Sequence, residues 1–291
     1  MYKMKTDTSK KGYVFFNTSD KIVRWSVARG VINSTLSLNL TGVASNAISF
    51  FTKQRITSQK QIFSNNISMW QLEKDLEDIR SCNFLTTCVS RLYGLYFFEK
   101  EDAENAKIMN YPIHFQDALL SEVNMDPSET YSKHDMNWIT FYNNFYKNYP
   151  KDWMERYWAG EICSYKDDNF PTIYETLTNS SMCICKKELR ENCFNMLADE
   201  YPNSMGTLKM SIIAAKQGSS LGSIYYEIEN DGFQTFLSPK IKYSESELTN
   251  FISNMKLSQE ELFLLLSEKD YILTHLEIPS FINEKIPVLF K

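Results

Sequence analysis

Residues 136–149 carry the strongest pattern in this sequence, a stripe of aromatic side chains at helical spacing. The aromatic positions recur every three or four residues, so they fall on one face of a helix. The members of this stripe are Trp138, Phe141, Tyr142, Phe145, Tyr146 and Tyr149. A face this rich in aromatic rings has to be buried, and we expect it to join a large core rather than to bind a cofactor.

The composition supports such a core. Aromatic residues make up 14% of the 291 residues, hydrophobic residues 43% and charged residues 23%. These values are typical of a globular protein and exclude disorder as its main state. The formal net charge of −5 creates no global basic field that would attract nucleic acid, although a local patch could still bind it.

The longest stretch without a charged residue runs from Gly30 to Thr52. It is rich in Asn, Ser and Thr, whose hydrogen bonds would be unmet in lipid, so we expect no transmembrane helix and no membrane partner. Residues 1–12 are charged but have no apolar run behind them, which excludes a secretory signal and leaves other export routes open. We expect the protein in the cytoplasm, or delivered to a host cytosol.

The six cysteines and three histidines do not have the spacing of a metal site. No CxxC is present, one residue separates Cys183 from Cys185, and the histidines (His114, His134 and His275) lie far from both in sequence. Zinc ligands usually come in pairs two to four residues apart, so we expect no metal. Reduced cysteines of a cytosolic protein are the simpler interpretation.

Several short segments have the patterns of strands. Residues 13–16 form an apolar run that ends in a turn at 17–20, and residues 35–40 alternate between polar and apolar. Residues 89–98 give the best strand pattern of the first half. Residues 172–185 predict a strand pair, or one long strand with a turn at Asn179 and Ser180.

Helices are expected between these strands. Ser68 and Gln71 resemble a capping box ahead of a helix with Leu72, Leu76 and Ile79 on one face. A short helix is predicted from Glu101 to Asn110. Pro150 ends the aromatic stripe, and a second short aromatic helix follows, which ends at Gly160.

The pattern changes near residue 190, which we take as a boundary between residues 1–190 and a mainly helical region, residues 191–291. Two further capping boxes are expected there, Ser244 with Glu247 and Ser258 with Glu261. The second precedes an apolar run at 262–266 that is too wide for one helix face. That helix is therefore expected to be buried on several sides or to meet a partner.

Familiar catalytic motifs are absent. The sequence contains no GxGxxG, no GxxxxGK[ST], no HExxH and no GxSxG. The sequence has only three histidines, which weakens the hypothesis of a Ser-His or Cys-His hydrolase. A hydrolase with Cys163 or Cys185 as nucleophile stays a weaker alternative, because the sequence offers no matched histidine.

One series of segments resembles a known group. A helix that ends in Glu77-x-x-Arg80 leads to Ser90-Arg91-Leu92, a strand, an acidic turn and a helix with Ala103 and Ala106. Tyr157-Trp158-Ala159-Gly160-Glu161 follows much later, and then a strand with a central glutamate, Glu175. In order and spacing these segments resemble a group of bacterial proteins in the ADP-ribosyltransferase-like superfamily, over roughly residues 65–180.

The resemblance implies an α+β fold, with a split antiparallel sheet core of ADP-ribosyltransferase type and flanking helices. It also implies a mono-ADP-ribosyltransferase that uses NAD as its substrate and acts as a bacterial toxin, effector or anti-phage factor. The acceptor would be a macromolecule, and the acidic charge favours protein over nucleic acid. Residues 191–291 would then position the target, or bind an antitoxin-like partner or a chaperone.

Glu175 is the catalytic residue that the resemblance implies. Transfer of ADP-ribose breaks the bond between nicotinamide and ribose, and positive charge develops on the ribose. A carboxylate beside the ribose stabilises that charge and can orient the acceptor. The alternative for Glu175 is an exposed glutamate on an edge strand.

The resemblance also implies four NAD-binding residues. Ser90 would hold the ribose or support Glu175, with a cap at the start of the strand as its alternative. Arg91 would bind a diphosphate oxygen through its planar fork, or else pair with an acid of this chain such as Asp78. Tyr93 would stack on nicotinamide unless Tyr96, on the opposite face of the strand, does so. Arg29 stands where the superfamily has a first-strand Arg or His, whereas Phe16 occupies the other place where that residue could lie.

A non-enzymatic interaction protein is the rival hypothesis. It would have the same α+β scaffold and would present the 262–266 helix or the aromatic stripe to a protein partner. Stabilisation of the fold by NAD would separate the two hypotheses, because a ligand stabilises the state that binds it.

Overall fold

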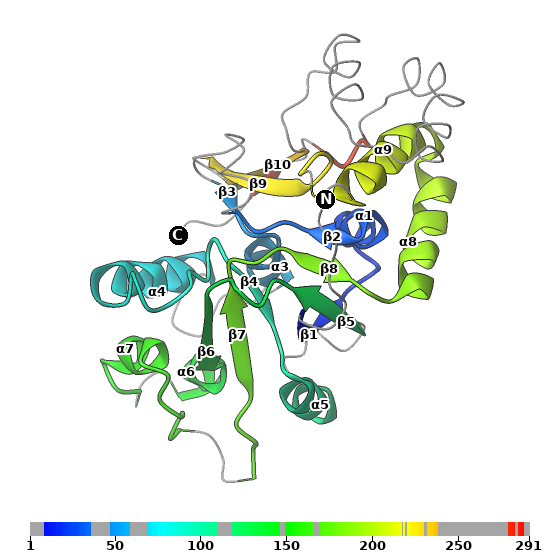
Figure 1. Cartoon of the computed structure of the whole chain (residues 1–291). Coiled ribbons are helices and arrows are strands. Elements are labelled where there is room, and N and C mark those ends of the chain that lie inside the picture. The colour runs from blue at the N-terminus through cyan, green and yellow to red at the C-terminus, as the bar shows by residue number, and fades with distance from the viewer. Residues whose placement is uncertain are drawn as a thin grey trace.

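The computed structural model describes most of the chain up to residue 237, together with two short segments near the C-terminus. The described residues are 9–35, 47–58, 69–109, 118–145, 149–165, 169–216, 218, 220–229, 232–237, 279–282 and 285–287. They form a mixed α+β structure with three antiparallel sheets (Figure 1). The α+β class expected from the sequence is therefore confirmed.

The first sheet has the strand order β1-β5-β8-β2 and the second has the order β11-β10-β9-β3. In Figure 1 the first sheet lies between the second and the third. The strands of the first sheet are Lys10–Phe16, Leu119–Met125, Met182–Ile184 and Val31–Ile32 (β1, β5, β8, β2). Those of the second are Lys285–Pro287, Gly232–Leu237, Ile224–Glu229 and Ala47–Ile48 (β11, β10, β9, β3).

The third sheet has the order β4-β7-β6 and carries the candidate site. Its strands are β4 (Leu95–Phe97), β7 (Tyr174–Thr178) and β6 (Tyr131–Asp135). Tyr13 and Phe98 exchange two backbone hydrogen bonds of 2.9 Å, which join the first sheet to the third. The centre of the third sheet is β7, so Glu175 lies on a central strand and not on an edge.

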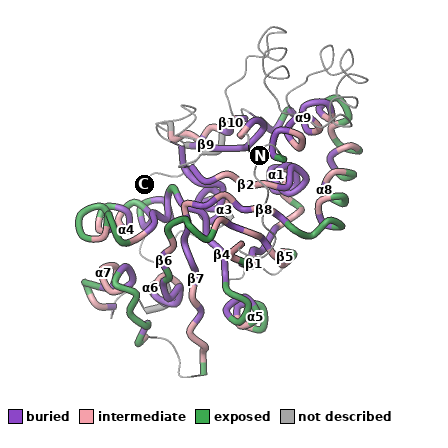
Figure 2. The backbone as a smooth tube through the Cα atoms, viewed as in Figure 1, coloured by how far each residue is buried: buried purple, intermediate pink, exposed green. Residues whose placement is uncertain are grey.

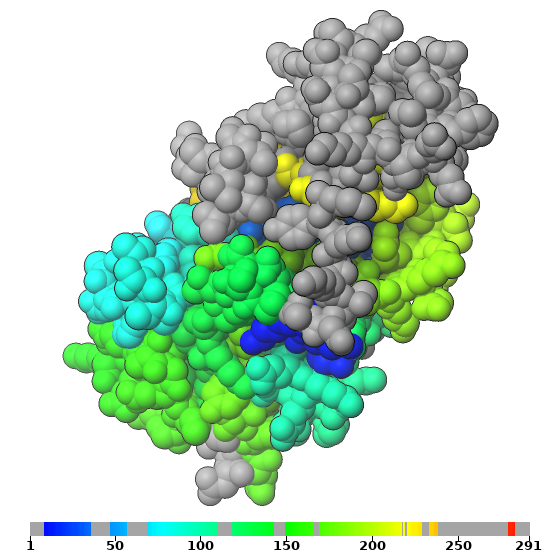
Figure 3. Space-filling model, viewed as in Figure 1, coloured from blue at the N-terminus to red at the C-terminus, as the bar shows by residue number. Residues whose placement is uncertain are grey.

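Helices surround the sheets. Near the first sheet lie α1 (Lys21–Arg29), α5 (Lys100–Ile108) and α8 (Lys187–Glu200), as Figure 1 shows. Near the third lie α3, α4, α6 and α7, at Phe50–Ser58, Met69–Asn83, Asn137–Phe145 and Trp153–Trp158. The turn η3 and the helix α9, at Pro202–Ser204 and Met205–Lys216, follow α8. Helices α4 and α7 are in contact. In the space-filling view the cyan surface of α4 adjoins the green surface of the segments near α7 (Figure 3).

One continuous core joins the halves of the described chain. It includes Trp25 of α1, Phe97 of β4, Trp138 of α6, Leu197 of α8 and Phe233 of β10. Figure 2 shows buried backbone through the centre and exposed residues on the outer side of α8 and of α4. The residue-190 boundary predicted from the sequence falls in the first turns of α8, which packs against α1.

The helix α1 shows how local sequence signals place these elements. The turn predicted at 17–20 ends in Asp20, whose carboxylate accepts a 2.8 Å hydrogen bond from the backbone N–H of Ile22 and so caps the helix. Gly30 ends the helix in the left-handed conformation, with φ of 88°. Because Arg29 is the last residue of α1, the expectation that it lies on a first strand is wrong.

The aromatic stripe forms a core helix, as predicted, but a shorter one. Helix α6 ends at Phe145, and Tyr149 lies beyond it. Tyr149 is still buried, and its hydroxyl donates a 2.9 Å hydrogen bond to the carbonyl of Trp138. Trp138 is fully buried, and Tyr142 stacks on Trp153 at 4.7 Å between ring centroids. The second aromatic helix is confirmed as α7, and Gly160 follows it with φ of 76°.

Two strand predictions need correction. Of residues 89–98 only 95–97 are strand, because the hydroxyl of Ser90 accepts hydrogen bonds from the N–H groups of Leu92 and Tyr93 and folds residues 90–94 into a turn. Residues 172–185 do contain two strands, but β7 and β8 belong to different sheets and do not pair with each other. The strand predicted at 13–16 is confirmed as part of β1.

Helix predictions fare better where the structure describes them. Helix α5 is close to the predicted 101–110, and α4 buries Leu72 and Leu76 as expected. The mainly helical character expected for 191–291 holds for α8 and α9, whereas β9, β10 and β11 form a sheet there. The segments 36–46 and 238–278, with most of the predicted 35–40 strand, both C-terminal capping boxes and the 262–266 helix, lie outside the described residues.

The sequence predicts no transmembrane helix and no metal site, and the structure bears on both only within its described residues. No helix described there has the length and apolar composition that a membrane crossing requires. Among the same residues, no group of three or more His, Cys, Asp or Glu side chains is placed to hold a metal ion.

Candidate functional site

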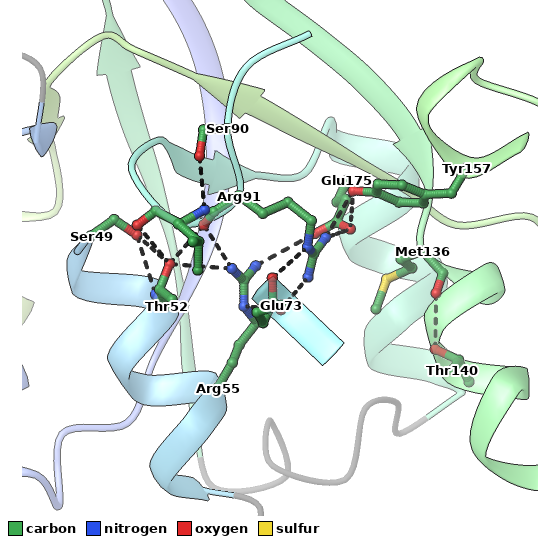
Figure 4. A network of polar contacts seen from close by, with 11 residues as sticks. Ser49, Thr52, Arg55, Glu73, Ser90, Arg91, Met136, Thr140, Tyr157 and Glu175 are labelled. Atoms are coloured by element: carbon green, nitrogen blue, oxygen red, sulfur yellow. Dashed lines mark hydrogen bonds and ion pairs between the residues drawn. The ribbon is translucent and has the colours of Figure 1, made fainter. Parts of the chain in front are cut away.

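Glu175, Arg91 and Tyr157 meet in a buried cluster of polar side chains beside the third sheet (Figure 4). Arg91 comes from the turn before β4, Tyr157 from α7 and Glu175 from β7. The cluster also includes Arg55 of α3 and Glu73 of α4. These five residues, which we call the Arg-Glu cluster, are separated by up to 120 positions in sequence and come from five different segments.

Arg91 is the centre of the Arg-Glu cluster. Its Nε and Nη2 donate hydrogen bonds of 3.0 Å to the two carboxylate oxygens of Glu73, a bidentate pairing. Its Nη1 donates to Oε1 of Glu175 and, at 2.8 Å, to the hydroxyl oxygen of Tyr157. Burial would lower the pKa of Arg91, but Glu175 and Glu73 outweigh it and raise this pKa well above its ordinary value.

Arg55 contacts the same two carboxylates at longer range. Its Nε lies 3.3 Å from Oε1 of Glu73, and its Nη1 lies 3.9 Å from Oε2 of Glu175. Its Nη2 donates a 3.0 Å hydrogen bond to the backbone carbonyl of Arg91, and its guanidinium lies over the ring of Tyr96, 5.0 Å from the centroid. Two guanidinium groups thus balance two carboxylates.

The two carboxylates are held differently. Burial favours the neutral form of Glu73, but the guanidinium groups of Arg55 and Arg91 outweigh it and lower its pKa below the ordinary value. Oε1 of Glu175 accepts from Arg91 and, at 3.0 Å, from the hydroxyl of Tyr157. In the described part of the chain, Oε2 of Glu175 accepts no hydrogen bond, and the Nη1 of Arg55 lies 3.9 Å from it.

The helix α3 places Arg55 for this role. Ser49 precedes the helix, and its hydroxyl oxygen accepts a 3.2 Å hydrogen bond from the N–H of Thr52. The hydroxyl of Thr52 donates at 2.7 Å to the carbonyl of Arg91, to which Arg55 also donates. The start of α3 and the turn after Ser90 are thereby tied together, so the Arg55 and Arg91 side chains meet.

Ser90 takes part in a neighbouring network rather than in the Arg-Glu cluster. Its hydroxyl donates a 2.7 Å hydrogen bond to Oε2 of Glu77 and accepts from the turn that follows it. Glu77 in turn pairs with Arg80, whose Nη1 donates 3.0 Å to the carbonyl of Cys88. No hydrogen bond joins Ser90 to Glu175 in the described part, and the Ser90 hydroxyl caps the turn that precedes β4 rather than the start of the strand itself.

Arg29 and Tyr93 lie apart from the Arg-Glu cluster. The Nε of Arg29 donates 3.1 Å to the carbonyl of Leu221, and its Nη1 donates 2.6 Å to that of Val31 and 2.9 Å to Oδ1 of Asn33. Burial lowers the pKa of Arg29 to about 9. Tyr93 lies in the turn with 38% of its surface exposed, whereas the ring of Tyr96 is buried under Arg55.

A hollow of about 350 Å³ lies beside the Arg-Glu cluster, between β6, the end of α7 and the turn at residues 84–88. Its lining includes Phe84, Thr87, Cys88, Ser132, His134 and Trp158. His134 is paired directly with Glu175 across strands β6 and β7, and its ring stacks on Tyr157 at 4.7 Å. Glu175 itself does not line this hollow.

The sequence analysis missed Arg55, Glu73 and His134. Arg55 and Glu73 lie on ordinary amphipathic helices, and no motif marks them. The one available signal was the alternation of β6, which places Ser132 and His134 on the same face two residues apart.

Comparison with known proteins adds no relative. A scan against protein-family models finds no match for the chain, and a search of curated proteins finds none either.

Proposed function

We propose that this chain is a mono-ADP-ribosyltransferase, which moves ADP-ribose from NAD to a macromolecular acceptor. The observation that carries the proposal is the state of Glu175. Its Oε1 is fixed by Arg91 and Tyr157, while its Oε2 accepts no hydrogen bond in the described part of the chain. A buried, oriented carboxylate whose second oxygen has a 3.9 Å ion pair, but no hydrogen bond among the described residues, suits the stabilisation of positive charge on a ribose.

The segments of the family resemblance support the same reading. Arg91, Tyr157 and Glu175 belong to three motifs that are far apart in sequence, and they contact one another directly. The proposal thus assigns Glu175 the catalytic role and Tyr157 the task of orienting its carboxylate.

The proposed reaction is a nucleophilic substitution at the ribose C1′. The bond from C1′ to the nicotinamide nitrogen breaks, and its electron pair leaves with nicotinamide. A nucleophilic oxygen or nitrogen of the acceptor forms the new bond to C1′ and gives up its proton. In this proposal Oε2 of Glu175 stabilises the positive charge that develops on the ribose and accepts that proton.

The two guanidinium groups suit the diphosphate of NAD in charge and in geometry, because a guanidinium binds phosphate oxygens through two parallel N–H groups. Both are now paired with carboxylates and almost fully buried. Arg55 lies 3.3 Å from Glu73 and 3.9 Å from Glu175, whereas Arg91 forms a bidentate pair with Glu73 at 3.0 Å. We therefore assign the diphosphate first to Arg55, whose ion pairs with the two carboxylates are the longer ones.

The acceptor in this proposal is a protein, since the net charge of −5 disfavours a polyanion. The role as a toxin, effector or anti-phage factor, and an antitoxin-like partner for residues 191–291, follow from the superfamily resemblance. They are part of the same proposal.

One observation favours a second candidate, a non-catalytic interaction protein on the same scaffold. Glu175 is only 5% exposed, and its Oε1 already has two donors. A neutral cluster of two arginines and two glutamates can serve simply to hold α3, α4, α7 and β7 together. In that case NAD would find no site.

Binding of NAD distinguishes the two candidates. At a concentration 100 times the dissociation constant, a ligand adds about 2.7 kcal/mol to the free energy of unfolding. The transferase proposal expects NAD to raise the thermal midpoint of unfolding. A midpoint that stays constant up to millimolar NAD would support the interaction protein.

Activity is tested with labelled NAD and a cell lysate separated into protein and nucleic-acid fractions. We expect label in the protein fraction, and label in nucleic acid would correct the acceptor. Glu175→Gln should abolish transfer, and Glu104→Gln on the exposed face of α5 is the matched control. Full turnover by a folded Glu175→Gln variant would refute the catalytic assignment.

A further inference from the structure

The hollow beside β6 has a polar floor made by two side chains of one strand face. Ser132 and His134 are both buried, and the Nε2 of His134 lies 2.9 Å from the Oγ of Ser132. The Nδ1 of His134 lies 3.0 Å from the backbone carbonyl oxygen of Tyr157. Among the described residues, neither side chain forms a hydrogen bond with a side chain of the Arg-Glu cluster.

These contacts fix the direction of every hydrogen bond on the floor. A carbonyl oxygen only accepts, so the Nδ1–H of His134 is the donor to Tyr157 and the neutral ring has its lone pair on Nε2. The hydroxyl of Ser132 therefore donates to Nε2. The Oγ of Ser132 also accepts a 3.0 Å hydrogen bond from the N–H of Val89, which leaves it one lone pair.

The hollow has no uncompensated charge. Burial lowers the pKa of His134 to about 4, so its ring is neutral near pH 7. The ammonium group of Lys133 lies 2.9 Å from Glu99 and 3.6 Å from Asp102 and is balanced by them. The thiol of Cys88 donates to the carbonyl of Trp158 at 3.3 Å, and burial raises its pKa, so it too is neutral.

Two aromatic residues contribute to the lining. Phe84 and Trp158 both line the hollow, and the indole of Trp158 meets the His134 ring edge-on at 5.0 Å. The indole N–H of Trp158 donates to the carbonyl of Leu76, so it offers no donor to a ligand. The volume of about 350 Å³ lies at the lower end of the range for small-molecule sites.

From these features we infer that the hollow is a binding site for a small, neutral, planar ring compound that carries an N–H donor. The ring would pack against Phe84 and Trp158, and its N–H would donate to the remaining lone pair of Ser132. An ionised ligand would find no counter-charge there, and a ring without a donor would leave the Ser132 oxygen unsatisfied.

A ligand bound in the hollow would affect the Glu175 carboxylate. The His134 ring stacks on Tyr157, whose hydroxyl donates to Oε1 of Glu175, so two contacts join the site to the carboxylate. The inference itself does not depend on transferase activity, because it concerns binding in the absence of NAD.

Indole and benzofuran test the inference with one matched pair of probes. They have nearly the same shape, but benzofuran has an oxygen in place of the N–H. Histidine ¹⁵N resonances of the full-length protein report binding, and the spectra of variants His114→Gln and His275→Gln identify the His134 signals by elimination. We expect indole to shift the His134 signals with a dissociation constant on the order of 1 mM, typical of a fragment, and benzofuran to bind at least about five-fold more weakly.

A pair of variants locates the site. Thr87→Phe places a ring at an exposed lining position and should weaken indole at least about five-fold. The adjacent exposed Thr86→Phe, which adds the same ring outside the lining, should not. Equal binding of both probes, no shift at His134 up to 10 times the expected constant (about 10 mM), or equal indole affinity of the two variants would each overturn the inference.

Discussion

The hydroxyl of Tyr157 donates a 3.0 Å hydrogen bond to Oε1 of Glu175, and the Nη1 of Arg91 donates to both groups. Tyr157 lies in the last turn of the short helix α7, and Glu175 lies on the central strand of the third sheet. This triangle therefore ties two elements that have no backbone hydrogen bond between them in the described part. Burial raises the pKa of Tyr157 well above its ordinary value, which keeps the hydroxyl protonated and able to donate.

Removal of that hydroxyl should cost stability without breaking the ion pairs. Tyr157→Phe keeps the ring that stacks on His134 but deletes a hydrogen bond to a charged carboxylate, worth about 1.5–3 kcal/mol. Urea unfolding at pH 7 measures the loss. Tyr174→Phe, on the same strand as Glu175 but outside the cluster, is the control and should change stability by less than about 0.5 kcal/mol. Equal losses in both variants would contradict the role given to the Tyr157 hydroxyl.

The buried His134 should make stability depend on pH between about 4 and 6.5. Its pKa falls from the ordinary 6.5 to about 4 because burial disfavours the charged ring, although Glu175 opposes this. Below pH 6.5 the unfolded chain binds a proton that the folded chain does not, so this stability is present at pH 7 and is lost as the pH falls toward 4. The His134 contribution to the free energy of unfolding changes by roughly 3 kcal/mol over this whole pH range.

The measurement compares urea unfolding of the native chain and of His134→Gln from pH 7 to pH 4.5. Carboxylates contribute equally to both curves, so their difference isolates the histidine. We expect the gap between the two curves to shrink toward low pH. Parallel curves would show that His134 titrates normally in the folded protein.

Arg29 should prove to be a structural residue. It ends α1 and donates to the carbonyls of Leu221 and Val31, thereby joining the N-terminal helix to the turn before β9. Arg29→Met leaves these buried acceptors without their donor, at about 1–3 kcal/mol each. The surface-exposed Arg156→Met is the control, since exposed ion pairs contribute about 1 kcal/mol or less.

NAD separates this role from the one that the superfamily resemblance implied for Arg29. Under the structural role, the Arg29→Met variant is less stable but gains the same increment from NAD as the native chain. Loss of the NAD increment in a folded Arg29→Met protein would restore Arg29 as a binding residue.

Sequence reasoning located the elements whose signals are local. The turn with Asp20, the strand around Val14, the helix with Ala103 and the aromatic helix around Trp138 each have their period and punctuation within a few residues. The Ser90 turn was missed because a hydroxyl that accepts two backbone N–H groups overrides the apolar alternation of 89–98. The separation of β7 from β8 is a long-range choice, which no local pattern encodes.

The candidate site was found in part for the same reason. Arg91 and Glu175 were chosen because short motifs surround them, and they do meet. Arg55 and Glu73 complete the charge balance from helices whose sequences show only ordinary amphipathic spacing. The four charged groups are buried together because α3 and α4 pack against the third sheet. No local sequence pattern predicts that packing.

Charge balance in the Arg-Glu cluster leads to the last prediction. Glu73 compensates Arg55 and Arg91 together, so Glu73→Gln leaves two buried guanidinium groups with only Glu175 between them. Breaking a buried pair in this way costs about 3–5 kcal/mol, because a charge is left without compensation. The double variant Arg55→Met with Glu73→Gln removes one charge of each sign and leaves Arg91 paired with Glu175. We expect the double variant to unfold at higher urea concentration than Glu73→Gln alone, although it has more substitutions. If the two losses simply add, the four groups do not act as one balanced unit, and the Arg-Glu cluster would have to be treated as separate pairs.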